Sequence, residues 1–157
     1  MYYDIQLTPH FKLSEFIKSS TAAALKMDLT PTLTVVSNLQ YLCQHGLEPL
    51  RQHFNCPIII NSGYRSLELN KYLYKDRPNE PAATTSNHLS GFAADIRVPD
   101  NETGMKWFRW LDQNLPDFDE LITERNNVGS ATFWIHLAIC QGGRSRRKVI
   151  QNLIKNK

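Results

Sequence analysis

Hydrophobic and polar residues follow two different patterns along this chain, and each pattern predicts a different kind of element. Over residues 32–53 the apolar positions are separated by three to five residues, which is typical of a long helix that packs on a core. Gly46 and Pro49 lie inside this segment, where we expect them to bend the helix. Three further segments are predicted to be helical: 13–25, 66–74 and 102–115.

Other segments are short, apolar and rich in β-branched residues, a pattern that favours strands. CPIIIN at 56–61 is apolar on consecutive positions, so we expect a strand that is buried on both faces. GFAADIRV at 91–98 predicts a second strand, and FDELITER and ATFWIHLAI predict a hairpin through the NNVGS loop. The chain therefore predicts a single α+β domain over residues 1–157, with a small, mostly antiparallel sheet packed against helices.

The composition is that of an ordinary globular protein, with 41% hydrophobic and 21% charged residues. No apolar run approaches the roughly 20 residues that a helix needs to cross a bilayer, and the start of the chain lacks the basic-then-apolar order of a signal peptide. We therefore expect synthesis in the cytoplasm without a signal peptide. The three cysteines are odd in number and scattered, which favours reduced thiols and predicts no cysteine metal site.

Basic residues are concentrated at the C-terminal end of the sequence. Residues 144–157 hold six of the 18 lysines and arginines and no acidic residue. This basic tail fits two interpretations: attraction to an anionic polymer such as one of the cell wall, or an amphipathic terminal helix that docks its apolar residues, and we favour the helix. No nucleic-acid partner is expected, because the tail lacks interleaved aromatic residues and belongs to no recognised module.

Three residues interrupt the apolar pattern with side chains that can bind a metal. His88 follows the polar loop 75–87, Asp95 lies in the next predicted strand, and His136 stands inside the apolar strand WIHLAI. Gly91 lets the backbone bend between the first two. A charge on a core-facing strand is costly unless a partner or a metal offsets it, so one shared divalent cation would stabilise this group. A metal held for hydrolysis needs such ligands and one open position for water.

The order of these motifs resembles that of a known enzyme family. SGYRS at 62–66, Asn70, SNHLSGFAADI at 86–96 and WIHLAI at 134–139 are similar to the signature of the zinc D-Ala-D-Ala carboxypeptidase and L-alanyl-D-glutamate endopeptidase family, which includes VanX-like dipeptidases. FKLSEFIKSSTA and LEPLR also resemble the helical part of its small bacterial and phage members. The resemblance covers residues 11 to 139, and it implies the hedgehog/DD-peptidase-like fold.

The resemblance also implies roles for individual residues. It implies that His88, Asp95 and His136 bind zinc, with water in the fourth place. It implies that Arg65 faces the substrate and steadies a carboxylate or an oxyanion, with a structural salt bridge as the alternative. Ser86 stands before the first ligand, where it either contacts the peptide or caps the turn.

Peptide hydrolysis on zinc also needs a general base, which takes a proton from the water. Many relatives carry this carboxylate three residues before the last histidine, where this chain has Phe133. The resemblance therefore favours Glu124, at the end of the preceding strand, with Glu120 as the rival. A tight NNVGS loop would pair Glu120 with His136, whereas a wider loop would bring Glu124 toward the metal.

The predicted function is zinc-dependent hydrolysis of D-amino-acid-containing peptides of bacterial peptidoglycan, by carboxypeptidase or endopeptidase action. Phe133 keeps an alternative open, in which a non-catalytic, metal-stabilised module binds cell-wall peptides or a partner protein. Because the substrate lies outside the cytoplasmic membrane, we expect action at the cell wall after release or phage delivery. A cytoplasmic dipeptidase is the other interpretation.

Overall fold

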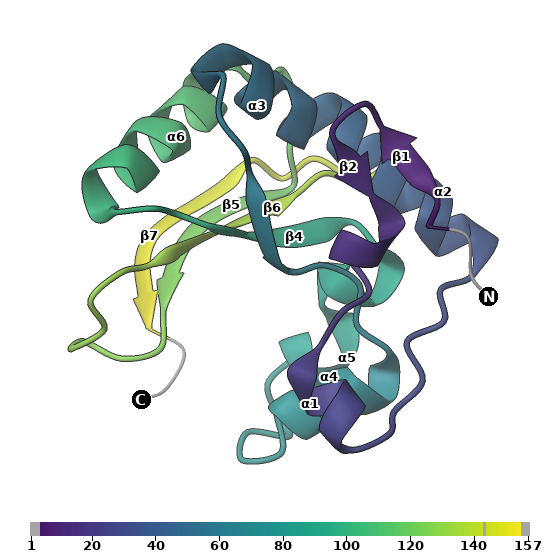
Figure 1. Ribbon diagram of the computed structural model, residues 1–157. Coiled ribbons are helices and arrows are strands. Elements are labelled where there is room, and N and C mark those ends of the chain that lie inside the picture. Colours follow the sequence, from purple (N-terminus) through teal and green to yellow (C-terminus); the bar gives the residue numbers. More distant parts are fainter. Residues whose placement is uncertain (1–3, 143, 155–157) are drawn as a thin grey trace.

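The structure is a computed structural model that describes residues 4–142 and 144–154. Figure 1 shows a twisted sheet with helices α2, α3 and α6 along one face and the short helices α1, α4 and α5 gathered at the opposite side of the molecule. The α-helices are α1 (Ser20–Ala24), α2 (Leu33–Leu42), α3 (Glu48–Phe54), α4 (Leu67–Leu73), α5 (Ala82–Thr85) and α6 (Asn101–Asn114). The strands are β1 (Gln6–Thr8), β2 (Phe11–Lys12), β3 (Ile59–Ser62), β4 (Ala93–Arg97), β5 (Glu120–Arg125), β6 (Trp134–Ala138) and β7 (Lys148–Ile154).

The main sheet confirms the predicted α+β class. Its strand order is β3-β4-β6-β5-β7, and every neighbouring pair is antiparallel except β5 and β7, which are parallel. A separate hairpin of β1 and β2 lies beside α2. The core fills the space between the sheet and its covering helices, and its fully buried side chains include Leu39, Leu50, Ile96, Phe108 and Leu111.

The long helical segment predicted over 32–53 forms with a bend in its middle. Residues Cys43–Leu47 form a π-turn between α2 and α3, and Pro49 follows in the first turn of α3, where its missing N–H is tolerated. Gly46 lies in the π-turn, and a Cβ atom there would come within 2.7 Å of the Ile139 side chain. The close approach of this helical segment to the sheet therefore depends on a glycine at this position.

Most of the other predicted elements are present with small changes at their ends. Helix α4 begins after Ser66, whose hydroxyl accepts from the backbone N–H of Leu69, and α6 begins after Asp100 in the same manner. The strand predicted over 91–98 is β4. The long polar loop that precedes it contains the short helix α5.

The helix predicted over 13–25 is wrong as one continuous element. A 3-10 turn forms at Leu13–Glu15, and α1 starts separately at residue 20. Ser19 is extended, and its hydroxyl accepts from the N–H of Ala22 at 3.2 Å, so it caps a new helix instead of continuing an old one. The pair of serines at 19 and 20 therefore breaks the helical pattern.

The prediction that residues 56–61 form a strand buried on both faces is also wrong. Strand β3 lies at the edge of the sheet, and burial alternates at its start: Ile60 and the preceding Ile58 are buried, whereas Ile59 is 47% exposed. An antiparallel edge strand packs only one face on the core, so consecutive apolar residues need not all be buried.

Residues 148–154 of the basic tail form a strand instead of the predicted helix. Strand β7 pairs parallel to β5, with Val149 opposite Leu121 and Ile150 opposite Ile122. β-branched residues suit this pairing better than a helix. The pairing shifts register near Asn152, whose φ is 60°, so a bulge interrupts this edge strand.

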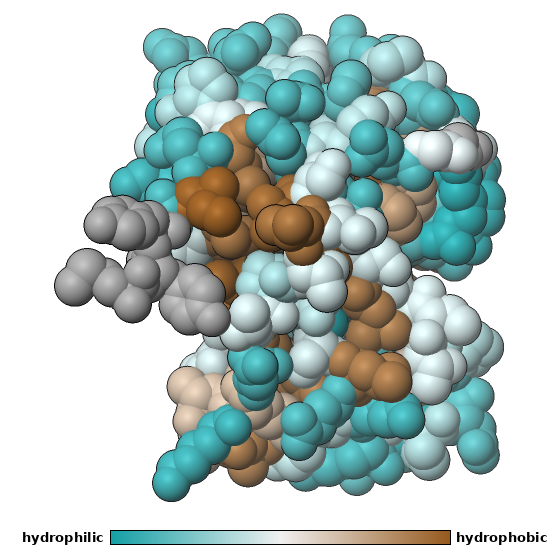
Figure 2. All heavy atoms as spheres, turned by 90° about the vertical axis from the view of Figure 1, so that its right-hand side faces the viewer, coloured by the Kyte–Doolittle hydropathy of each residue, from teal (hydrophilic) through white to brown (hydrophobic). Residues whose placement is uncertain are grey.

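Hydrophobic side chains gather in a band across the middle of the face in Figure 2, between two parts that are mostly hydrophilic. The three cysteines are free thiols, as predicted. Within the described residues, no helix has the length and apolar character to span a membrane.

Gly91 allows a test of the backbone that positions the loop before β4. Its φ is 73°, and a Cβ atom there would come within 2.8 Å of the Val35 carbonyl oxygen. We expect Gly91→Ala to lower the free energy of unfolding by at least about 1 kcal/mol, because alanine in the left-handed region costs about 1–2 kcal/mol before any clash. Urea denaturation measures the difference.

Gly129→Ala is the matched control, since a Cβ atom there would lie 3.5 Å from the side-chain oxygen of Asn127 and the φ of Gly129 is not positive. Its free energy of unfolding should stay within about 0.5 kcal/mol of the parent protein. An equal loss of free energy of unfolding in the two variants would contradict the role assigned to Gly91.

Candidate metal centre

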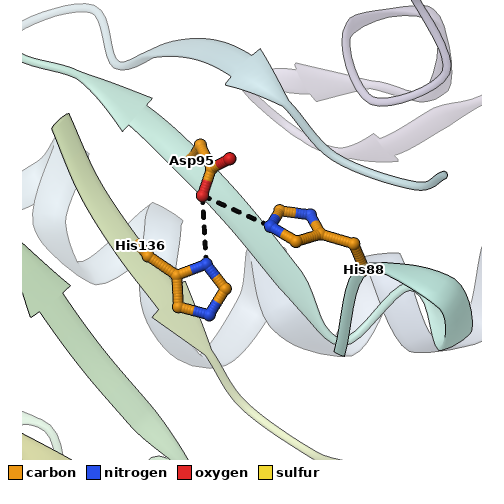
Figure 3. Close-up of side chains that lie close together, drawn as sticks. All are labelled: His88, Asp95 and His136. Carbon is orange, nitrogen blue, oxygen red and sulfur yellow. Dashed lines mark hydrogen bonds and ion pairs between the residues drawn. The ribbon is translucent and has the colours of Figure 1, made fainter. Parts of the chain in front are cut away.

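Three side chains from separate parts of the chain meet on the face of the sheet opposite the core. Asp95 lies in the middle of β4, and His136 lies directly opposite it in β6. His88 comes from the 3-10 turn Asn87–Ser90, and Gly91 then turns the chain into β4. Figure 3 shows the two imidazole rings and the carboxylate pointing toward one another.

The distances fit a shared metal ion. Asp95 Oδ1 lies 3.0 Å from His136 Nδ1 and 3.3 Å from His88 Nε2. One ligand atom from each residue lies within 4.8 Å of the others, and all three side chains are buried. Two imidazole nitrogens and one carboxylate oxygen are a donor set that suits a catalytic divalent metal with an open fourth position.

The hydrogen bonds of His88 point to the same conclusion. Its Nδ1 lies 2.6 Å from the carbonyl oxygen of Gly63, so this nitrogen carries the proton and donates. Burial and then the nearby Arg65 guanidinium lower the pKa of His88 to about 4, so the ring is neutral at pH 7. Its Nε2 lone pair therefore faces an Asp95 oxygen that is also an acceptor, and a cation between them would satisfy both.

His136 has a different environment. Burial disfavours its charged form, but hydrogen bonds to Asp95 and Glu120 outweigh burial and raise the pKa of His136 to about 9. Burial likewise opposes ionisation of Asp95, yet its imidazole neighbours hold the pKa of this carboxyl well below its usual range. With Nδ1 directed at Asp95, His136 Nε2 lies 3.2 Å from Glu120 Oε2. A carboxylate on the outer nitrogen of a metal-binding histidine fixes the ring and its tautomer.

Arg65 is held beside the cluster by three hydrogen bonds. Its Nη2 donates to Asp95 Oδ2 at 2.9 Å, its Nε to Ser62 Oγ at 3.1 Å, and its Nη1 to Asn70 Oδ1 at 3.3 Å. The buried Asn70 amide donates in turn to two carbonyls of α5. Arg65 thus makes the structural salt bridge named as the alternative, and it also lines the cleft described below.

Ser86 caps the turn that carries the first histidine. Its hydroxyl accepts from the His88 N–H at 3.3 Å, and the residue also lines the cleft. The capping interpretation therefore describes its contact in the structure. A contact with peptide stays a prediction.

The hairpin register determines where the two candidate bases lie. Ile122 pairs with His136, so Glu120 and Glu124 lie two residues to either side of Ile122, on the same face of the sheet. The tight-loop register, which placed Glu120 opposite His136, is wrong because residues 126–133 form a wider loop. As the wider-loop alternative predicted, Glu124 moves toward the metal site.

The two glutamates make different contacts. Glu120 bonds His136, as described above, and lies 3.4 Å from Lys148 Nζ; the bond from His136 is the main reason that its pKa is lowered to about 2. Glu124 is buried, and its Oε2 accepts from the indole N–H of Trp134 at 2.9 Å. Both glutamates line the cleft that also contains the two histidines.

This cleft has a volume of about 590 Å³, large enough for a short peptide segment. One wall comes from α5 and the turn before β4, and the other from β5, β6 and the C-terminal segment. The buried metal-ligand candidates thus open onto a space that a substrate could enter.

The sequence interpretation missed the polar network behind the site. Asn87 Nδ2 donates to Asp119 Oδ2 at 2.8 Å and to Glu120 Oε2 at 3.0 Å. Arg146 from the basic tail binds Asp119 through two nitrogens, each at 2.8 Å. Asn87 directly precedes His88, and Asp119 directly precedes Glu120. These positions in the sequence do not show that the side chains of Asn87 and Asp119 meet.

Comparison with known proteins gives one result. A sequence model of the family described as Peptidase M15 matches residues 9–137. The matched span contains the three ligand candidates and both glutamates, and it ends before the basic tail. No curated protein matches the chain.

Metal binding can be tested directly at His136. We expect purified protein to bind about one zinc ion per chain, and His136→Ala to lose it, because one histidine and one salt-bridged carboxylate are too few to hold the ion. Zinc content after dialysis, measured by atomic emission, gives the stoichiometry. His53→Ala is the control, since His53 stacks on Trp110 away from the cluster and should leave zinc content unchanged.

The contacts of Asp119 lead us to expect that the stability of the fold depends on pH. Burial opposes its ionisation, but bonds from Arg146 and Asn87 outweigh burial and lower the pKa of Asp119 to about 2. The ionised carboxylate therefore stabilises the fold above about pH 4, and this contribution is lost as the pH falls toward 2. Asp119→Asn should lower the urea midpoint at neutral pH and differ little from the parent near pH 2.

Asp76→Asn provides the comparison for this measurement, because Asp76 is exposed. Its urea midpoint should follow that of the parent protein at both pH values. A gap between Asp119→Asn and the parent that is the same at both pH values would contradict the assigned role of the carboxylate.

Proposed function

Since the chain belongs to the peptidase M15 family, we propose that it is a zinc-dependent peptidase that hydrolyses D-amino-acid-containing peptides of bacterial peptidoglycan, as a carboxypeptidase or an endopeptidase. The observation that carries this proposal is the buried group of His88, Asp95 and His136, which opens onto a peptide-sized cleft. A structural metal site would be closed, whereas this one faces space that a substrate can fill.

The donor set fits zinc, as the opposed acceptor atoms of His88 and Asp95 indicate. A zinc ion held there supplies a Lewis acid that polarises a peptide carbonyl and lowers the pKa of a water molecule. Glu120 then keeps the ring of His136 in place through its outer nitrogen.

Glu124 is the residue that we propose as general base. It stands on the same face of the hairpin as His136 and lines the same cleft. Its carboxylate is held by the Trp134 indole, so it is positioned to take a proton from water and return it to the leaving amine. Glu120 is less suited to this task, because its carboxylate already contacts His136, Arg146 and Lys148.

Phe133 has a structural explanation that supports an active enzyme. Its ring is buried in the core and packs closely against Gly104 on α6, where a Cβ atom would come within 2.7 Å of it. A carboxylate at position 133 would therefore face the helices and not the cleft. The absence of a base at that position is compatible with catalysis by a residue of β5, which weakens the case for a non-catalytic binding module.

Arg65 and Ser86 complete the proposed site. The guanidinium of Arg65 lines the cleft while it pairs with Asp95, so its remaining donor capacity can steady a substrate carboxylate or an oxyanion. Ser86 lines the same cleft, where we propose that it contacts a bound peptide.

We place the proposed activity at the bacterial cell wall, where such peptides occur, after release from the cell or delivery by a phage. Attraction of the basic tail to an anionic wall polymer stays a prediction, as does the absence of a nucleic-acid partner.

Digestion of purified peptidoglycan tests the proposed function and separates the roles of the glutamates. Zinc-loaded protein should release peptide fragments, detected by mass spectrometry. Glu124→Gln should retain zinc and lose about 10²–10⁴-fold in kcat, the usual contribution of a general base. Glu120→Gln should bind zinc about 10–100-fold more weakly and recover most of its activity at saturating zinc.

Lys106→Gln on the exposed side of α6 serves as the control for both variants, and it should digest peptidoglycan like the parent. If zinc-loaded parent protein releases no fragment, the peptidase proposal fails and the binding module remains. If Glu120→Gln at saturating zinc stays inactive while Glu124→Gln is active, the two assignments must be exchanged.

A further inference from the structure

Three cationic side chains of the basic tail lie on one wall of the cleft. Arg144, Arg146 and Lys148 line it together with the metal-ligand candidates. All three residues come after the span that the family model matches, 9–137. This wall is therefore supplied by a segment that lies outside the matched span.

The contacts of these cations show that they are held in place. Arg146 bonds both oxygens of the buried Asp119 and lies 3.1 Å from Glu120 Oε1. Arg144 contacts the side-chain oxygen of Asn87, and its Nε lies 3.2 Å from Asp119 Oδ2. Fixing cationic side chains in advance reduces the entropy lost when they bind an anion.

Charge is not balanced at this end of the cleft. Among the residues that the structure describes, the three cations face two carboxylates, those of Asp119 and Glu120, so one positive charge is left over. The cationic side chains are each about half exposed, whereas the Asp119 carboxylate is fully buried behind them. The surface offered to a ligand is therefore cationic.

Arg144 and Lys148 retain the capacity to bind a further group. Among the described residues, Lys148 Nζ has one charged partner, Glu120 Oε1, at 3.4 Å, although an ammonium group carries three donors. Arg144 has one carboxylate partner among the described residues, Asp119, whereas Arg146 is engaged by two. The binding capacity of this wall therefore rests mainly on Arg144 and Lys148.

We propose that Arg144 and Lys148 form an anion subsite that selects peptides carrying a free carboxylate near the bond to be cleaved. The inference rests on the proposed peptidase function and deepens it. One glutamate side chain, Glu120, separates Lys148 from His136, so an anion held at the subsite lies close to the metal centre. A carboxylate matches the forked donors of an arginine and the point charge of a lysine. The subsite lies inside a cleft, which suits a short peptide better than a large polymer.

Peptide binding tests the subsite separately from catalysis. The probes are a synthetic peptidoglycan stem peptide with free carboxylates and the same peptide with every carboxylate converted to an amide. Binding is measured by calorimetry on zinc-loaded Glu124→Gln protein, and hydrolysis of both peptides is measured in parallel on the parent. We expect the free acid to bind about tenfold more tightly than the amide.

Arg144→Gln and Lys148→Gln, each added to that protein, should remove most of this preference without weakening binding of the amide. Lys106→Gln removes the same charge on α6, outside the cleft, and should retain the full preference. Arg144→Lys keeps the charge but loses the fork, so an intermediate preference is expected. Thermal unfolding identifies any variant that fails to fold, and Lys148→Gln, which removes a single 3.4 Å contact, is the variant on which the test then rests.

The two proposals fail in different ways. If the parent cleaves neither peptide, the peptidase function fails, and the binding preference still reports on the subsite. Equal binding of acid and amide, or an unchanged preference in both variants, would overturn the subsite. Displacement of both peptides by inorganic polyphosphate, without any preference between them, would identify this wall as a polymer-binding surface and also overturn it.

Discussion

The site depends on a buried carboxylate that the sheet places between two imidazoles. Asp95 and His136 stand directly opposite each other in an antiparallel pair, so the register of β4 against β6 brings their side chains onto one face. A one-residue shift would turn one of them into the core, where its charge would be left without a partner. Because the core face of both strands is apolar, burial of that face fixes the register and with it the geometry of the candidate metal centre.

The register of β5 against β6 also gives two similar glutamates different contacts. Glu120 and Glu124 stand on either side of the position opposite His136, and their neighbours then distinguish them. One reaches the outer nitrogen of the histidine and the cations of the tail, and the other reaches the indole of β6. Small differences in register and in neighbouring donors thus separate an orienting carboxylate from a candidate proton acceptor.

Much of this arrangement can be predicted from sequence, and the exceptions have physical causes. The ligand candidates and the mostly antiparallel sheet follow from residues that interrupt apolar strands and from an ordered set of motifs. The hairpin register does not, since loop width is set by how Phe133 packs and not by the NNVGS turn alone. The sequence predicted a helix for the tail because Val149 and Ile150 suit an apolar helix face as well as a strand. Pairing with the edge of β5 decides in favour of the strand. The Asn87–Asp119 network joins residues 32 positions apart, which local patterns do not connect.

Strand β7 has a second consequence, which concerns encounters between molecules. It leaves one border of the sheet open, and an open border can recruit a strand from another copy and start aggregation. The bulge at Asn152 breaks the regular ladder, and the charge of Lys148 stands at the start of the strand. Both features discourage such recruitment, so the segment that shapes the cleft also acts as a guard against self-association.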